Sequence, residues 1–197
     1  GSIRIPSALC GVVGMKPTFG RVSRHGVFPL SNSLDTVGPM TRTVEDNAIM
    51  LNAIAGYDEQ DSFSAKVEVT NFKSNLEKDI RELKIAKLEP YFYDVIDPEV
   101  LNLIDKACDK FNGLGVAVET VELRVLEHTL AISGSILLTE AAELHSKNLN
   151  EKAALIGSDV KLRLQQGALI SGVDYVKSQR ARTVYNQQMN ELHLRKF

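Results

Sequence analysis

The sequence predicts an α/β protein with a mixed β-sheet flanked by helices, and three features support that class. Residues 83–123 have the pattern of a strand, a helix and a second strand. Beyond residue 126 nearly every stretch favours helix, and residues 1–40 hold only short β-branched runs between turns. A strand–helix–strand unit usually joins parallel strands by a right-handed crossover, as in α/β proteins.

Residues 1–40 are predicted to form short strands separated by turns, because glycine and proline recur throughout them. Val12-Val13 is the best strand candidate. Loops whose path is fixed by so many turns usually build sites on a scaffold. A helix is predicted next over residues 44–55, since Thr43 and Asp46 have the spacing of a capping box and Gly56 is a suitable stop.

Residues 57–82 are polar and irregular, and are predicted to form an exposed connection with one short helix. Alternating apolar and charged residues predict a strand over 83–88. Asp97 as N-cap and Pro98 at the first helical position start a helix that ends near Gly113. A second strand is predicted over 116–123.

Helices are predicted to fill the chain after residue 126, with breaks near Gly157-Ser158 and Ser171-Gly172. The charged stretch 174–197 is predicted to be a helix with a solvated face. No internal repeat and no low-complexity tract interrupts this order.

Composition and charge exclude several function classes. The 197 residues carry 23 Lys and Arg against 25 Asp and Glu, so the net charge of −2 lacks the basic excess of a general nucleic-acid binder. No apolar run reaches the roughly 20 residues that cross a bilayer, and no signal peptide is recognisable. The sequence therefore predicts a cytoplasmic globular protein without direct nucleic-acid or membrane binding.

Cysteine and histidine usage favours neither a disulfide scaffold nor a metal site. Cys10 and Cys108 lie far apart and outside any C-x-x-C pattern. The four histidines show no metal-ligand spacing, and Glu140, Glu143 and His145 are interpreted as ordinary helix-surface charges. No metal is expected.

Two stretches of the sequence carry a specific resemblance. The first is GSIRIPSALCGVVGMKPTFGRVS at residues 1–23, and the second is SLDTVGPMTRTVED at residues 33–46. Together they closely resemble the amidase signature family over about 50 residues, and the likeness continues more loosely beyond. The resemblance implies a partial amidase-signature domain over residues 1–197, with the family's α/β fold.

The resemblance also implies a catalytic set of a serine nucleophile, a bridging serine and a lysine. Ser2 matches the nucleophile, and Gly1 matches the edge of the turn whose backbone N–H groups form the oxyanion hole. A lysine acts as base only when its pKa is lowered, and the bridging serine would relay the proton. The reaction needs no cofactor, and its substrate would be a small amide.

The segments that carry the family's lysine and bridging serine precede the nucleophile, so they are not expected within this sequence. Lys16 follows Ser2 and does not match the base. The C-terminal continuation of the family is likewise not expected here. The isolated chain is therefore predicted to be inactive, and its unpaired strand edges predict self-association into homo-oligomers.

Three functions stay open. A stand-alone amidase is preferred, because residues 133–147 lack the tyrosine- and asparagine-rich pattern expected of the alternative. That alternative is the glutaminase component, the A subunit, of the glutamyl-tRNA(Gln)/aspartyl-tRNA(Asn) amidotransferase, which would work with partner subunits. The third is a non-catalytic truncated product that serves as a binding partner.

Individual residues near Ser2 have ordinary structural interpretations. Arg4 is expected to brace its loop rather than bind a carboxylate, and Cys10 to be a small core residue. Asp35 is expected to cap a turn. Gly1-Ser2 is also a common cloning remnant, but its unbroken continuation into Ile-Arg-Ile-Pro favours native residues.

Overall fold

The structure is a computed structural model that describes residues 1–89, 91–93 and 95–196. It divides into two units, residues 1–78 and residues 79–197, each with its own internal packing. The predicted α/β class is confirmed. The strands of the described part form two separate pairs, one antiparallel and one parallel.

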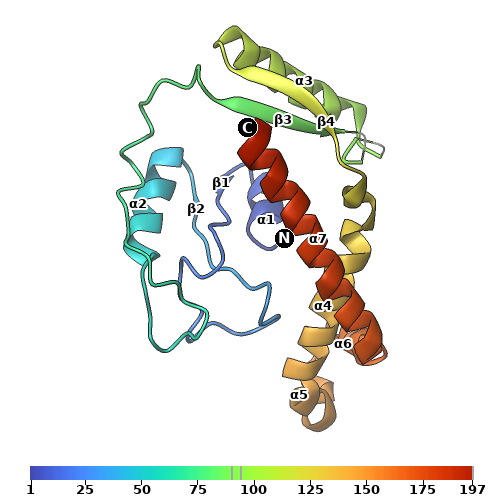
Figure 1. Cartoon of the computed structure of the whole chain (residues 1–197). Coiled ribbons are helices and arrows are strands. Elements are labelled where there is room, and N and C mark those ends of the chain that lie inside the picture. Colours follow the sequence, from blue (N-terminus) through green and yellow to red (C-terminus); the bar gives the residue numbers. More distant parts are fainter. Residues whose placement is uncertain (90, 94, 197) are drawn as a thin grey trace. The chain divides into compact units, whose positions relative to one another are not determined.

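Unit 1 is built from two short helices and a small hairpin-like pair, coloured blue to cyan in Figure 1. In order these are α1 (Arg4–Leu9), β1 (Val13–Gly14), β2 (Met40–Thr41) and α2 (Val44–Ile54). β1 and β2 are antiparallel, with Val13 opposite Thr41. The core is small and centres on Leu51, Val22 and Ala48.

Helix α1 was not predicted, because Pro6 and the neighbouring glycines suggested turns. Pro6 lies in the first turn, where a backbone N–H needs no intrahelical partner. By contrast, α2 was predicted within one residue. The Thr43 side chain accepts a hydrogen bond from the Asp46 N–H at 3.0 Å, so the predicted cap is confirmed.

The prediction of a short helix within residues 57–82 was wrong, since the described residues there form turns and bends. The stretch is also less exposed than expected. Asp61 is 7% exposed because its carboxylate is paired inside the unit. Asn52 of α2 holds the later part of the stretch, donating to the Thr70 carbonyl and accepting from the Phe72 N–H.

Unit 2 begins with the predicted strand–helix–strand unit (Figure 1). β3 (Lys84–Glu89) and β4 (Ala117–Glu122) are parallel, joined through α3 (Pro98–Gly113). The Asp97 carboxylate caps α3 by accepting the Glu99 N–H at 2.8 Å. Lys87 of β3 donates to Asp105 of α3 at 2.8 Å, and this carboxylate, with Glu89, raises the lysine's pKa.

The rest of unit 2 is helical, as predicted. It comprises η1 (Arg124–His128), α4 (Thr129–Leu144), α5 (Ser146–Glu151), η2 (Ala153–Leu155), α6 (Ser158–Ala168) and α7 (Gly172–Lys196). The predicted breaks before α6 and α7 are confirmed, while those at His145 and Lys152 were not predicted. Phe197, the end of the predicted charged helix, lies outside the described residues. In the described part of the chain, no helix is both long and apolar enough to cross a bilayer.

Helices α4 and α6 pack closely because Gly167 has no side chain. A Cβ built on Gly167 would lie 2.0 Å from the Leu138 carbonyl oxygen and 3.0 Å from Ala142 Cβ. Ile136, Ala141 and Leu164 are buried in the same unit. The crossing is therefore set by contact between the backbones themselves.

Candidate functional site

Ser2 lies in the turn that leads into α1 and is exposed. The turn is fixed by its backbone, because the Gly1 carbonyl accepts the Ile5 N–H at 3.0 Å and the Ile3 carbonyl accepts the Ser7 N–H at 3.2 Å. An accessible hydroxyl on a fixed turn is what nucleophilic attack on a substrate requires. The position of Ser2 is therefore compatible with its predicted role.

The residues that follow Ser2 were predicted to hold no base for it, and the Lys16 side chain is engaged elsewhere. Lys16 donates from Nζ to the adjacent Pro17 carbonyl at 2.7 Å. Arg4 is exposed and its side chain makes no hydrogen bond within the described residues, so its expected bracing of the loop is wrong for this part of the chain. Cys10 is also exposed rather than in the core. The apolar run before it, which includes Leu9, lies on the surface of unit 1, so the run does not mark the core.

The turn of Ser2 and the start of α1 pack directly against β1 and against the chain before β2. A Cβ on Gly14 would lie 2.0 Å from the Ser7 hydroxyl oxygen and 3.1 Å from the Ile3 carbonyl oxygen. A Cβ on Gly38 would lie 2.8 Å from Ile3 Cδ1 and 2.2 Å from the Met15 carbonyl oxygen. Only glycine permits either approach, so both glycines fix the segment next to Ser2.

Asn47 of α2 ties these two passages of chain together. Its side chain is buried, and Nδ2 lies 3.3 Å from the Val13 and Pro39 carbonyl oxygens and 3.1 Å from Thr41 Oγ1. Met15 N–H adds a hydrogen bond to the Pro39 carbonyl at 3.1 Å. A single amide thus satisfies carbonyls from β1 and from the chain entering β2.

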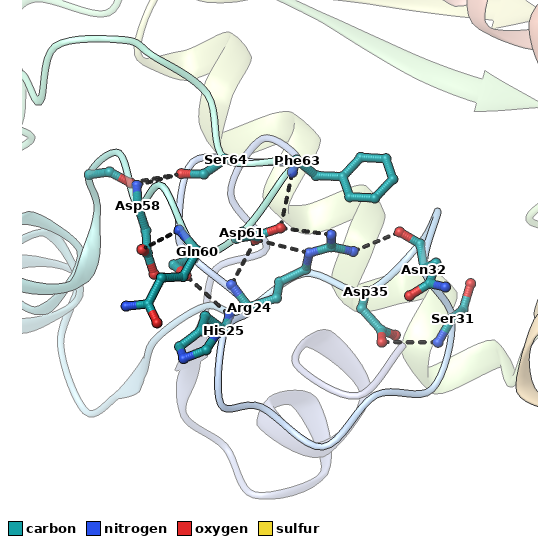
Figure 2. A network of polar contacts seen from close by, with 12 residues as sticks. Arg24, His25, Ser31, Asn32, Asp35, Asp58, Gln60, Asp61, Phe63 and Ser64 are labelled. Carbon is teal, nitrogen blue, oxygen red and sulfur yellow. Dashed lines mark hydrogen bonds and ion pairs between the residues drawn. The ribbon is translucent and has the colours of Figure 1, made fainter. Parts of the chain in front are cut away.

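The loop between β1 and β2 is shaped by polar side chains. Asp35 accepts the N–H groups of Leu30 and Ser31 at 2.8 and 2.9 Å, which confirms its predicted role in capping a turn. Figure 2 shows Arg24 lying between Asp61 on one side and the Asn32 carbonyl on the other. Arg24 therefore connects the loop to the segment 58–64.

Asp61 gathers four donors on one carboxylate. Arg24 donates from its backbone N, Nε and Nη2 at 2.9, 3.2 and 3.0 Å, and the Phe63 N–H donates at 3.0 Å. Hydrogen bonding from Arg24 holds the pKa of Asp61 far below its ordinary value, although burial opposes the shift. The pair is therefore charged throughout the physiological range of pH.

Two aromatic rings enclose the guanidinium of Arg24. Its Cζ lies 5.0 Å from the Phe19 ring centroid and 4.7 Å from that of Phe63, and the rings meet edge to face at 5.7 Å. Asp58 nearby accepts the Ser23 hydroxyl at 2.6 Å, and this bond lowers the pKa of its carboxyl. Ser23, Arg24 and the 58–64 segment form one connected network.

Sequence reasoning missed Arg24, Asp61 and Asn47. Arg24 and Asp61 lie 37 positions apart in polar, irregular stretches, where no periodicity marks them as partners. The available signal was the density of glycine, proline and aspartate on both stretches, which indicates loops of defined path. Among the described residues, no group of three or more His, Cys, Asp or Glu could hold a metal ion.

Unit 2 holds a separate polar contact between helices. Tyr175 of α7 donates its hydroxyl to Glu140 of α4 at 2.8 Å and accepts from Gln179 at 2.9 Å. Burial, together with the contact to Glu140, raises the pKa of Tyr175. This contact joins α4 to α7.

Comparison with known proteins finds the profile of one family, Amidase, matching residues 1–194. An amidase of Pseudomonas putida is 39% identical over 196 residues, covering 99% of this chain and 42% of that protein. The A subunit of the glutamyl-tRNA(Gln) amidotransferase of Staphylococcus saprophyticus is 39% identical over 216 residues, covering 98% of this chain and 44% of that protein.

Solved structures agree with these relatives. A chain of the structure described as "An unexpected vestigial protein complex reveals the evolutionary origins of an s-triazine catabolic enzyme" superimposes with a TM-score of 0.90 at 33% identity. The match covers 98% of this chain and 41% of that one. The chain thus spans less than half the length of the proteins that it matches.

Proposed function

We propose, from the premise that this chain belongs to the amidase family, that it carries the nucleophilic serine of a hydrolase that cleaves a carboxylic amide. The observation that carries the proposal is the family match over residues 1–194. The assignment of the nucleophile to Ser2 rests on the resemblance of residues 1–23 to the amidase signature. The exposed, backbone-fixed turn of Ser2 supports it. We propose this hydrolase activity for a whole protein of the relatives' length, of which the present chain covers less than half.

The chemistry proceeds by acyl transfer. Ser2 Oγ attacks the amide carbonyl carbon while its proton passes to a base, and the negative charge develops on the carbonyl oxygen. The C–N bond then breaks, and ammonia or an amine leaves with a proton. Water attacks the resulting ester, which releases the carboxylic acid and restores the Ser2 hydroxyl. The base and its bridging serine are those that the family resemblance implies, upstream of this segment.

Gly1 is proposed to contribute the edge of the oxyanion turn. Glycine before the nucleophile lets the backbone approach the reacting carbonyl and direct N–H donors at the oxyanion. Removal of one such donor typically reduces turnover by about 10²–10³.

A stand-alone amidase is preferred over an amidotransferase component because of how the sequences align. The Pseudomonas putida amidase, 39% identical, aligns with 99% of this chain over only 196 positions, so the alignment has almost no gaps. The amidotransferase component needs 216 positions to cover 98% of this chain, so it carries residues for which this chain has no counterpart. It is kept as the second candidate because many of the similar proteins bear that name.

The test uses a chimaera in which residues 1–197 replace the matching segment of the Pseudomonas putida amidase. We expect the chimaera to hydrolyse amides and to react with a fluorophosphonate at Ser2. Ser2→Ala abolishes both. Ser7→Ala is the matched control, because the Ser7 hydroxyl is buried without a hydrogen-bond partner and its loss removes no hydrogen bond.

Three outcomes would each overturn a different part of the proposal. Undiminished hydrolysis or labelling by the Ser2→Ala chimaera excludes Ser2 as nucleophile. Rapid, site-specific labelling of Ser2 in the isolated 197-residue chain contradicts the expected inactivity of the segment alone. Glutamine-dependent ammonia release that rises when a tRNA-binding partner is added would reverse the preference between the two candidates.

A further inference from the structure

We propose that the Arg24–Asp61 pair positions the Ser2 turn for attack, acting through the loop 30–38. The inference rests on the proposed function, since Ser2 must be the reacting residue. Arg24 and Asp61 touch no reacting atom and are positioning residues. The contacts run from the pair to the loop 30–38, and from that loop to Ile3, which is next to Ser2.

The pair is buried and fully engaged. The side chains are 13% and 5% exposed, and every nitrogen of the Arg24 guanidinium has an acceptor: Nε and Nη2 on Asp61, and Nη1 on the Asn32 carbonyl. Burying two charges costs about as much as their attraction returns, and apolar residues often replace such a pair without loss of stability. We therefore assign to the pair the role of fixing a defined geometry rather than of adding stability.

The geometry that the pair defines is the path of the loop. Arg24 Nη1 donates to the Asn32 carbonyl at 2.6 Å. The same loop turns around Asp35, which holds the Leu30 and Ser31 N–H groups. No helix or strand spans residues 15–39 in the described structure, so side-chain contacts of this kind set where the loop runs.

The end of the loop 30–38 packs directly against Ile3. Gly38 approaches Ile3 Cδ1 and the Met15 carbonyl so closely that a methyl group would lie 2.8 and 2.2 Å from them. Ile3 is the residue next to Ser2. A loop released from Arg24 therefore transmits its displacement to the Ser2 turn, and a misplacement of about 1 Å can lower turnover by about 10²-fold.

The experiment compares Arg24→Lys with Arg21→Lys in the chimaera described above. Lysine keeps the charge but not the fork that reaches both Asp61 and Asn32. Arg21 is the matched control because it stacks on Phe72 at 5.5 Å in the same segment. We expect Arg24→Lys to lower kcat about 10- to 100-fold with KM within about twofold, and Arg21→Lys to change neither.

If Arg24 only stabilised the fold, Arg24→Lys would lower the amount of folded enzyme and leave the kcat of each folded molecule unchanged. Active sites are counted with the fluorophosphonate, so a variant that only folds less well keeps its kcat per labelled site. The double variant Arg24→Met/Asp61→Leu separates the roles further, because an apolar pair can restore the unfolding temperature. We expect it to remain as slow as Arg24→Lys; a return of kcat with stability overturns the inference.

The two proposals fail in distinguishable ways. If Ser2→Ala keeps activity, the proposed function is wrong. If Ser2→Ala is inactive and Arg24→Lys keeps its kcat per site, only the positioning role is wrong. Should the chimaera not fold, hydrogen exchange on the 197-residue chain decides: we expect Arg24→Lys to speed exchange at Met15 N–H, which bonds Pro39, by about tenfold or more, with α2 unchanged. Unchanged exchange at Met15 overturns the inference.

Discussion

Gly167→Ala tests the crossing of α4 and α6 most directly. The new Cβ would lie 2.0 Å from the Leu138 carbonyl oxygen and 2.6 Å from its carbon, whereas real Cβ contacts under 3.0 Å essentially never occur. The helices must separate by at least about 1 Å, because the obstacle is backbone and has no alternative rotamer. Overpacking of this kind typically costs about 1–3 kcal/mol, occasionally more.

Alanine also favours the helix by about 1 kcal/mol relative to glycine, which offsets part of that cost. We therefore expect Gly167→Ala to lower the free energy of unfolding by about 1 kcal/mol and the melting temperature by roughly 3–5 °C. Circular dichroism of thermal and guanidinium unfolding measures both. The matched control is Gly134→Ala in the middle of α4, where a Cβ meets nothing within 4 Å. That change is expected to stabilise by about 0.5–1 kcal/mol. A Gly167→Ala protein as stable as Gly134→Ala refutes the backbone contact.

Further predictions concern the polar contacts and the exposed surface. Asp61→Asn is expected to lower the unfolding free energy at neutral pH by about 2 kcal/mol. Because the folded pKa of Asp61 lies below its unfolded value of about 3.9, this stabilisation is present above that pH and lost as the pH falls further, so stability curves of the two proteins against pH converge in acid. Tyr175→Phe removes the tyrosine with a raised pKa, and an ultraviolet titration should lose its most alkaline step; an unchanged titration contradicts burial beside Glu140. The isolated chain is expected to self-associate, because Leu9 and Leu169 are 83% and 86% exposed among many apolar side chains; a monomer in light scattering argues against this.

The elements with strong local signals were predictable from the sequence. Thr43 with Asp46 marked the start of α2, Asp97 with Pro98 marked α3, and alternation marked β3 and β4. These signals act within a few residues, so one window of sequence contains both partners. Helix α1 escaped prediction because Pro6 in a first turn looks the same in sequence as Pro in a loop.

The residues of the candidate site also fall into those with a local sequence signal and those without one. The turn role of Asp35 was predicted from local sequence and is confirmed, whereas the nucleophile role of Ser2, assigned by resemblance, stays a prediction. The Arg24–Asp61 pair and the Asn47 amide depend on contacts across 37 and up to 34 positions. Nothing in either polar stretch specifies its partner, because the choice is made by the folded backbone. Polar pairs between distant residues are therefore the part of the site that cannot be predicted from the periodicity of the sequence.

The small apolar core of unit 1 explains why polar contacts carry this much of the site. With few buried side chains such as Leu51 and Val22, hydrophobic packing alone cannot select one path for the loop between β1 and β2. Directional bonds from Arg24, Asp35 and Asn47 and the close approach of two glycines make that selection instead. The path of the chain beside Ser2 is thus fixed by hydrogen-bond geometry, which tolerates less displacement than apolar contact does.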